Sequence, residues 1–246
     1  MNPIDVSYPH PVSPGHEPAA ARAVVVAGPL GHELHAARQA AARVLRNTYA
    51  LLAMTLLVSA GVAAASTSLA LPAPGLVVSL VGMFGLLYAT HKLASSAWGL
   101  VAVFAFTGFM GYTLAPAIGR TLAIDGGAQI VALALGSTAL TFLALSSWVL
   151  ASRRDFSFMG GFLFAGMMVA LLAAVGATVF QLPALALAVS ALVVLLSAGL
   201  MLFETSRIVH GGETNYLLAT VGLYVSIFNL FSGLLSLFGI GGGGDD

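Results

Sequence analysis

Apolar residues dominate the chain from Thr48 to Ile240, and only short polar joints interrupt them. A helix needs about 20 such residues to cross the hydrocarbon layer of a bilayer, so this stretch has room for about seven or eight crossings. Charged residues make up 7% of the chain, whereas a soluble globular domain carries about 25%. So few charges cannot cover a protein surface in water, but they suffice in lipid. The sequence therefore predicts an all-α integral membrane protein.

Proline, glycine and charged residues divide the apolar stretch into seven segments, which predicts a seven-transmembrane-helix bundle over residues 48–240. The expected crossings are about 48–66, 75–90, 97–118, 128–150, 158–180, 184–203 and 216–240.

Both ends of the chain differ from the bundle in composition. Residues 1–47 are rich in proline and histidine at first, which predicts a mobile cytoplasmic tail. Within them, residues 31–47 contain good helix formers and a basic face, so this part either lies at the headgroup surface or is a solvated linker. Residues 241–246, with the sequence GGGGDD, are expected to form a flexible acidic tail.

Basic residues predict the orientation. With seven crossings and a cytoplasmic amino terminus, eight of the nine Lys and Arg residues fall on the cytoplasmic side, and Arg120 alone falls on the other. The carboxyl end would then be periplasmic.

Two segments carry a stripe of small and polar residues along one helical face. Lipid gives apolar helices no drive to associate, so such stripes favour close packing between helices. The stripes consist of Gly222, Ser226, Asn229, Gly233 and Ser236 in the last segment and Gly108, Gly111 and Ala115 in the third. Pro116 follows the second stripe and favours a kink there.

The motifs of common enzymes are absent from the sequence. There is no HExxH, no phosphate-binding loop, no GxSxG elbow and no cysteine. The six histidines are scattered and do not predict a metal site, and nine Lys and Arg residues over the whole chain do not form a nucleic-acid surface. We therefore expect a protein that is not an enzyme, has no cofactor and does not bind nucleic acid.

Glu204 ends an otherwise uncharged segment, and Arg207 follows three residues later. If the helix continues, the two side chains share a face and can pair. An acid at membrane depth is a candidate proton or cation site, and the alternative is an interfacial acid solvated at a helix end. Glycines at positions 211 and 212 would break the helix, and Thr214 or Asn215 can cap the next one.

A second polar joint contains Arg153, Arg154 and Asp155. The two arginines can anchor the inner interface, and Asp155 can begin the next helix favourably. The joint is either a topology anchor or a docking surface for a partner.

Five stretches together resemble one family. They are RVLRNTYALLAMTL (43–56), FAFTGFMGYTLAPAI (104–118), SRRDFSFMGGFL (152–163), LFETSRIVHGGETNY (202–216) and LYVSIFNLFSGLLSLFG (223–239). In this order they resemble the Bax inhibitor-1 family, and the first stretch is similar to its bacterial YccA-like branch. The resemblance covers roughly residues 43–239.

The resemblance implies a seven-helix protein of the bacterial inner membrane with a central last helix. In the YccA-like branch it implies a partner, the membrane-anchored ATP-dependent protease FtsH, which the protein binds and restrains. The loop motifs then supply candidate partner contacts, namely Arg153, Arg154, Asp155, His210, Glu213 and Asn215.

Other branches of the family imply a pH-sensitive calcium leak that uses two acids on the last two helices. Glu204 matches the first acid, but Ser226 stands at the second position, and His91 or Lys92 matches the basic partner only loosely. One carboxylate with Ser226 and Asn229 offers few charged oxygens, and hard cations need several. A protease modulator is therefore our first expectation, and a cation leak or transporter at Glu204, Arg207, Ser226 and Asn229 is the alternative.

Overall fold

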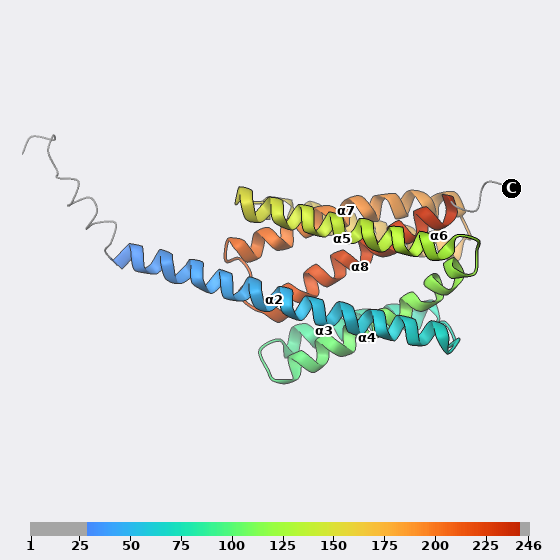
Figure 1. The fold of residues 1–246 in the computed structure, drawn as a ribbon, viewed down its shortest axis with the longest axis horizontal. Coiled ribbons are helices and arrows are strands. Elements are labelled where there is room, and N and C mark those ends of the chain that lie inside the picture. The colour runs from blue at the N-terminus through green and yellow to red at the C-terminus, as the bar shows by residue number, and fades with distance from the viewer. Residues whose placement is uncertain (1–28, 242–246) are drawn as a thin grey trace, which may run out of the picture. The chain divides into compact units, whose positions relative to one another are not determined.

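The computed structural model describes residues 29–241, and within this range the secondary structure is helical. The elements, labelled in Figure 1, are α2 (Pro29–Ser68), α3 (Leu76–Leu93), α4 (Trp98–Leu122), α5 (Gly127–Ser152), the 3₁₀ turn η1 (Ser157–Met159), α6 (Gly160–Val179), α7 (Pro183–Val209) and α8 (Tyr216–Gly241). Seven of these helices are long and apolar enough to cross a bilayer. The predicted all-α class and the number of crossings are therefore confirmed.

The helix ends differ from the prediction mainly where charged residues occur inside a helix. α7 runs to Val209 rather than Phe203, so it includes Glu204 and Arg207. α2 runs without a break across the predicted boundary at residue 47. Most of the predicted amino-terminal tail, residues 1–28, and residues 242–246 lie outside the described residues.

α8 is the central helix of the bundle, between α5, α7 and the part of α2 that follows Ala41 (Figure 1). Half of its membrane-spanning residues are buried. Tyr224, 1% exposed, lies at its middle, donates a hydrogen bond to the Thr107 carbonyl of α4 (3.2 Å) and accepts one from Ser59 Oγ of α2 (2.7 Å). One buried hydroxyl thus ties three helices together.

The stripe on α8 faces α7, as close packing requires. A Cβ atom on Gly222 would approach the Glu204 carboxyl group, and one on Gly233 would lie 2.8 Å from a Val194 methyl group. Ser236 hydrogen bonds to Ser190 at 3.0 Å.

The stripe on α4 faces α2. A Cβ atom on Gly111 would collide with the Ser59 backbone, and Thr67 Oγ1 donates to the Ala115 carbonyl (3.3 Å). α4 continues through Pro116 to Leu122. Both predicted stripes are therefore packing faces.

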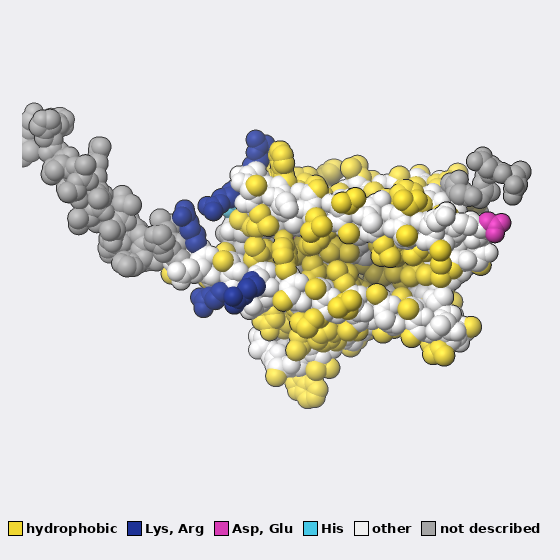
Figure 2. Space-filling model, viewed as in Figure 1, with side chains coloured by type: hydrophobic (Ala, Val, Ile, Leu, Met, Phe, Trp, Pro, Cys, Tyr) yellow, Lys and Arg dark blue, Asp and Glu magenta, His cyan; other side chains and the backbone are white. Residues whose placement is uncertain are grey.

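The bundle surface is apolar where lipid would contact it. Figure 2 shows no charged side chain over the middle of the visible face, and the visible Lys and Arg side chains gather near one end. η1 and α6 carry some of the most exposed apolar residues, with Phe158 of η1 and Phe162 of α6 more than 70% exposed. Such exposure is unfavourable in water and favourable in a bilayer.

Candidate functional site at the joint between α7 and α8

Glu204 lies near the end of α7, and its carboxylate faces α8 at Gly222. A Cβ atom added to Gly222 would lie 2.7 Å from the carboxyl carbon of Glu204, so this glycine makes room for the acid. Arg207 Nη1 lies 3.5 Å from Glu204 Oε2, and the Glu204 side chain is 14% exposed. The pair that the i, i+3 spacing predicts is therefore present. A role for this pair in proton or cation binding stays a prediction.

Arg207 also binds a second acid, Glu213. Its Nη2 donates to Glu213 Oε2 at 3.2 Å. Gly211 has a φ of 74°, a left-handed conformation that glycine adopts without strain and that ends α7. The reversal brings Glu213 back over the last turn of α7. One guanidinium thus lies between two carboxylates, one inside the bundle and one in the joint.

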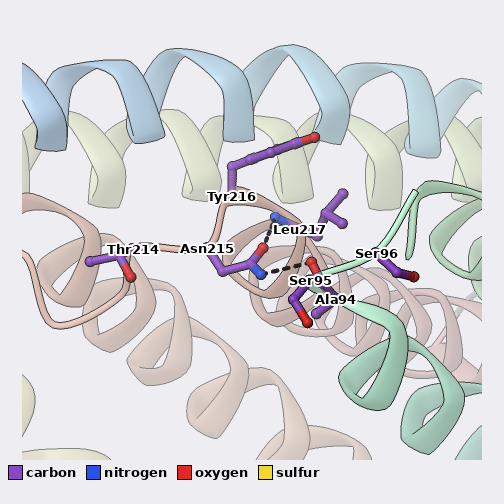
Figure 3. Close-up of a pocket in the computed structure, with 7 residues that line it drawn as sticks. All are labelled: Ala94, Ser95, Ser96, Thr214, Asn215, Tyr216 and Leu217. Carbon is purple, nitrogen blue, oxygen red and sulfur yellow. Dashed lines mark hydrogen bonds between the residues drawn. The ribbon is translucent and has the colours of Figure 1, made fainter. Parts of the chain in front are cut away.

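Asn215 connects this joint to the first turn of α8 and to the end of α3 (Figure 3). Its Oδ1 accepts a hydrogen bond from the Leu217 N–H (2.9 Å), which caps α8 as predicted. Its Nδ2 donates to the carbonyl of Ala94 (2.9 Å), directly after α3. The Asn215 N–H in turn donates to Glu213 Oε1 (2.9 Å). A continuous set of polar contacts therefore runs from Glu204 to the end of α3.

A cavity of about 450 Å³ lies beside these bonds. Its lining, drawn in Figure 3, consists of Ala94, Ser95, Ser96, Thr214, Asn215, Tyr216 and Leu217. The lining contains no charged side chain, so the cavity offers hydroxyl and amide groups rather than an ion site.

The other predicted site residues are not gathered around Glu204. Ser226 is buried, and its Oγ donates to the Gly222 carbonyl of its own helix (3.0 Å). Asn229 is half-buried, and no hydrogen bond joins it to Glu204 in the described structure. His91 and Lys92 are exposed at the end of α3, where His91 Nδ1 contacts its own helix at the Leu87 carbonyl (3.0 Å). The residue that Glu204 faces is Gly222, one turn before Ser226.

The joint between α5 and α6 docks on the last turns of α7 through Ser206 and His210. Ser206 Oγ accepts a hydrogen bond from the Phe156 N–H (2.9 Å) and lies 3.4 Å from Asp155 Oδ1. His210 Nε2 lies 3.0 Å from the Arg153 carbonyl. The end of α7 therefore holds both neighbouring joints, one through Ser206 and His210 and the other through Arg207.

Asp155 begins the next helical turn, as predicted. Its Oδ1 accepts a hydrogen bond from the Ser157 N–H (2.8 Å). Hydrogen bonds from Ser157 hold the pKa of the Asp155 carboxyl below its usual value, because they stabilise the ionised form. Arg153 and Arg154 are exposed beside it, where a partner or lipid headgroups can reach them.

Sequence reasoning missed Ser206 and did not assign Gly222 to the acid. Ser206 and His210 are four residues apart and therefore share a helical face, which was a readable signal. Gly222 belongs to the predicted stripe, but only the offset between α7 and α8 shows that it meets Glu204.

The geometry of the acid suits a structural ion pair better than a metal site. In the part of the chain that the structure describes, no three His, Asp or Glu side chains come together closely enough to hold a metal ion. Arg207 supplies a positive charge to both Glu204 and Glu213, and this competes with any cation.

The comparisons with known proteins agree with the fold. The family model described as "Inhibitor of apoptosis-promoting Bax1" matches residues 41–243. The "Modulator of FtsH protease YccA" of Escherichia coli K12 is 53% identical over 197 residues, which cover 80% of this chain and 90% of the relative. An uncharacterised Pseudomonas aeruginosa protein is 51% identical over 202 residues, covering 82% of this chain and 91% of the relative.

A further relative, from Escherichia coli O6:H1, is named "Inner membrane protein YccA" and is also 53% identical, over 80% of this chain and 90% of its own length. Together with the seven apolar helices, this makes the chain a multi-pass protein of the inner membrane. Because the family model covers nearly all of the helical bundle, the chain belongs to the Bax inhibitor-1 family.

Proposed function

We propose that this protein binds and restrains an FtsH-type, membrane-anchored ATP-dependent protease, and that it is not itself an enzyme. The observation that carries the proposal is the 53% identity to a relative named as a modulator of that protease, over 90% of the relative's length. The match covers 80% of this chain, so it takes in most of the helical bundle.

The packing of the bundle offers a physical basis for restraint. A protease that pulls a membrane protein from the bilayer must separate its helices. Here α8 is enclosed by its neighbours, and the end of α7 is tied to both adjacent joints by Ser206 and Arg207. A substrate-like protein that resists extraction would occupy the protease without being degraded quickly.

The predicted amino-terminal tail, residues 1–47, completes this proposal as the segment that the protease engages first. We place it in the cytoplasm because most Lys and Arg residues then lie on the cytoplasmic side of the membrane. With seven crossings, the carboxyl end is then periplasmic. The exposed residues Arg153, Arg154 and His210 at the same end are candidate contacts for the partner.

Co-purification tests the proposal. Full-length protein, with an affinity tag, is isolated from detergent-solubilised membranes that contain FtsH, beside a variant lacking residues 1–40. We expect the full-length protein to retain FtsH and to slow its turnover of a membrane substrate. The truncated variant should retain the bundle but lose most of the slowing.

Two controls make the result decisive. An Arg153→Gln, Arg154→Gln double variant tests the inner joint separately from the tail, and an Arg120→Gln variant changes the charge at the other end of the bundle. If full-length protein neither retains FtsH nor alters its substrate turnover, the proposal is wrong.

The alternative function is a pH-sensitive cation leak, and the partly buried Glu204 carboxylate beside α8 supports it. Purified protein in liposomes would then pass calcium or protons, and Glu204→Gln would abolish the flux. Tyr88→Phe, on the exposed face of α3, is a matched control that should change nothing. Flux that survives Glu204→Gln would contradict this function.

A further inference from the structure

A second cavity, of about 380 Å³, lies between the last turns of α4 and α8. α4 starts just after Lys92 and α8 just after Arg207, so both helices begin at the basic end of the bundle and this cavity is at the opposite end. Its lining includes Leu114, Ala117 and Arg120 of α4, Ile124 after it, and Leu235 of α8. Neither the proposed protease interaction nor the Glu204 pair involves this region.

Arg120 is an exception to the charge distribution of the bundle. Among the described residues it is the one Lys or Arg at this end, and the two ion pairs of the described structure both belong to Arg207, at the opposite end. Its side chain is exposed in the last turn of α4. Asp125, the nearby acid, is also exposed and does not pair with it. A guanidinium that has no partner among the described residues and lies at a membrane surface is suited to bind a phosphate through two parallel hydrogen bonds.

The rest of the lining is apolar apart from hydroxyl groups. Leu114, Ala117, Ile124 and Leu235 provide carbon surface.

We propose that this cavity binds one anionic phospholipid of the adjacent leaflet, with the phosphate on Arg120 and the glycerol and first acyl carbons against the apolar wall. A free inorganic anion would use Arg120 but leave the apolar wall without a contact. A lipid satisfies both parts, and the volume is within the range of about 300–1,000 Å³ that small-molecule sites have. The bound lipid fills the gap between α4 and α8 at an end where no ion pair joins these helices.

A photoactivatable phosphatidylglycerol tests this site in full-length protein in bilayer nanodiscs, with crosslinked peptides located by mass spectrometry. We expect labelling of residues 114–124 and 232–239. Arg120→Gln should reduce this labelling about tenfold, the effect of losing a charge-assisted bidentate contact. Arg154→Gln, a change of an exposed arginine at the opposite end, should leave it unchanged.

A second variant separates the cavity from surface charge. Ala117→Leu keeps Arg120 but fills part of the cavity, and it should reduce the same labelling several-fold. Labelling at the opposite joints, together with the thermal unfolding midpoint, shows that each variant is folded.

Several results would overturn the proposal. Labelling that is unchanged in both variants would do so, as would loss in Arg120→Gln but not in Ala117→Leu, which indicates surface attraction alone. Equal labelling by a phosphatidylethanolamine probe would remove the anionic preference. Displacement by excess inorganic phosphate would mean that the site recognises a free anion instead of a lipid.

Discussion

α8 and α3 are both apolar enough to cross a bilayer, yet they differ greatly in burial. Half of the membrane-spanning residues of α8 are buried, whereas Thr90 is the one buried residue of α3. Mean hydropathy is similar in the two, 1.8 for α8 and 1.5 for α3. Apolar composition therefore decides that each helix enters the membrane, but it does not decide which helix occupies the centre.

Small and hydroxyl-bearing residues account for the difference. α8 meets its neighbours through Gly222, Gly233 and the Tyr224 hydroxyl. α3 has Gly82 against Phe109 of α4, but a Cβ atom on Gly85 would meet no atom within 4 Å beyond the backbone of its own helix. In lipid, where apolar side chains gain nothing by leaving the solvent, close backbone approach and hydrogen bonds specify the central helix.

The largest expected effect compares Gly233→Leu in α8 with Gly85→Leu in α3. A Cβ atom at Gly233 would lie 2.8 Å from Val194 and 3.1 Å from the Ser190 carbonyl oxygen, so a leucine must push α7 away. We expect a loss of about 3 kcal/mol in the free energy of unfolding. Gly85→Leu has open space around it and should change this free energy little. Equilibrium unfolding in mixed micelles measures both.

Equal effects of the two leucine substitutions would contradict the assignment of α8 as the packed helix and α3 as the lipid-facing one.

A smaller effect is expected from removing one hydroxyl in each helix. Tyr224→Phe deletes the bonds to Ser59 and Thr107, and the buried Ser59 hydroxyl loses its partner on α8. We expect a cost of about 1–2 kcal/mol in the free energy of unfolding. Tyr88→Phe changes a side chain that is 66% exposed and should be neutral. A Tyr224→Phe protein as stable as wild type would show that this hydroxyl does not hold the centre together.

The connection between the two helices can be tested at Asn215, which caps α8 and binds the residue after α3. Asn215→Ala removes both bonds and should cost about 1 kcal/mol. Its neighbour Thr214 is exposed, so Thr214→Ala serves as the control. Hydrogen exchange of residues 93–97 should also increase in Asn215→Ala. Exchange that stays the same would mean that α3 is positioned without this contact.

The sequence was sufficient to predict seven crossings, both packing stripes and the pairing of Glu204 with Arg207, because each depends on composition or on spacing within one helix. The end of α7 was predicted at Phe203, but the helix ends six residues later, at Val209. Charged residues were taken to end the helix, but Arg207 and Glu204 compensate each other within it.

Contacts between helices were harder to predict. Glu204 meets Gly222 rather than Ser226 because the vertical offset of α7 against α8 is set by the whole bundle. The same holds for Ser206, an uncharged residue of α7 whose contact with the α5–α6 joint depends on how that joint packs against the helix. Neither of these two contacts can be predicted from the spacing of residues along a single helix.

The smallest effect is expected at Asp155, in the joint between α5 and α6. Hydrogen bonds from Ser157 lower the pKa of its carboxyl in the folded protein relative to the unfolded chain. The ionised carboxylate therefore stabilises the joint above the unfolded-state pKa, and this contribution is lost as the pH falls through the lower, folded-state pKa. Hydrogen exchange of residues 155–159, corrected for intrinsic rates, should lose protection over that acidic range. Asp155→Asn should show little of this pH dependence, whereas an unchanged pH profile in the variant would assign the titration to another group.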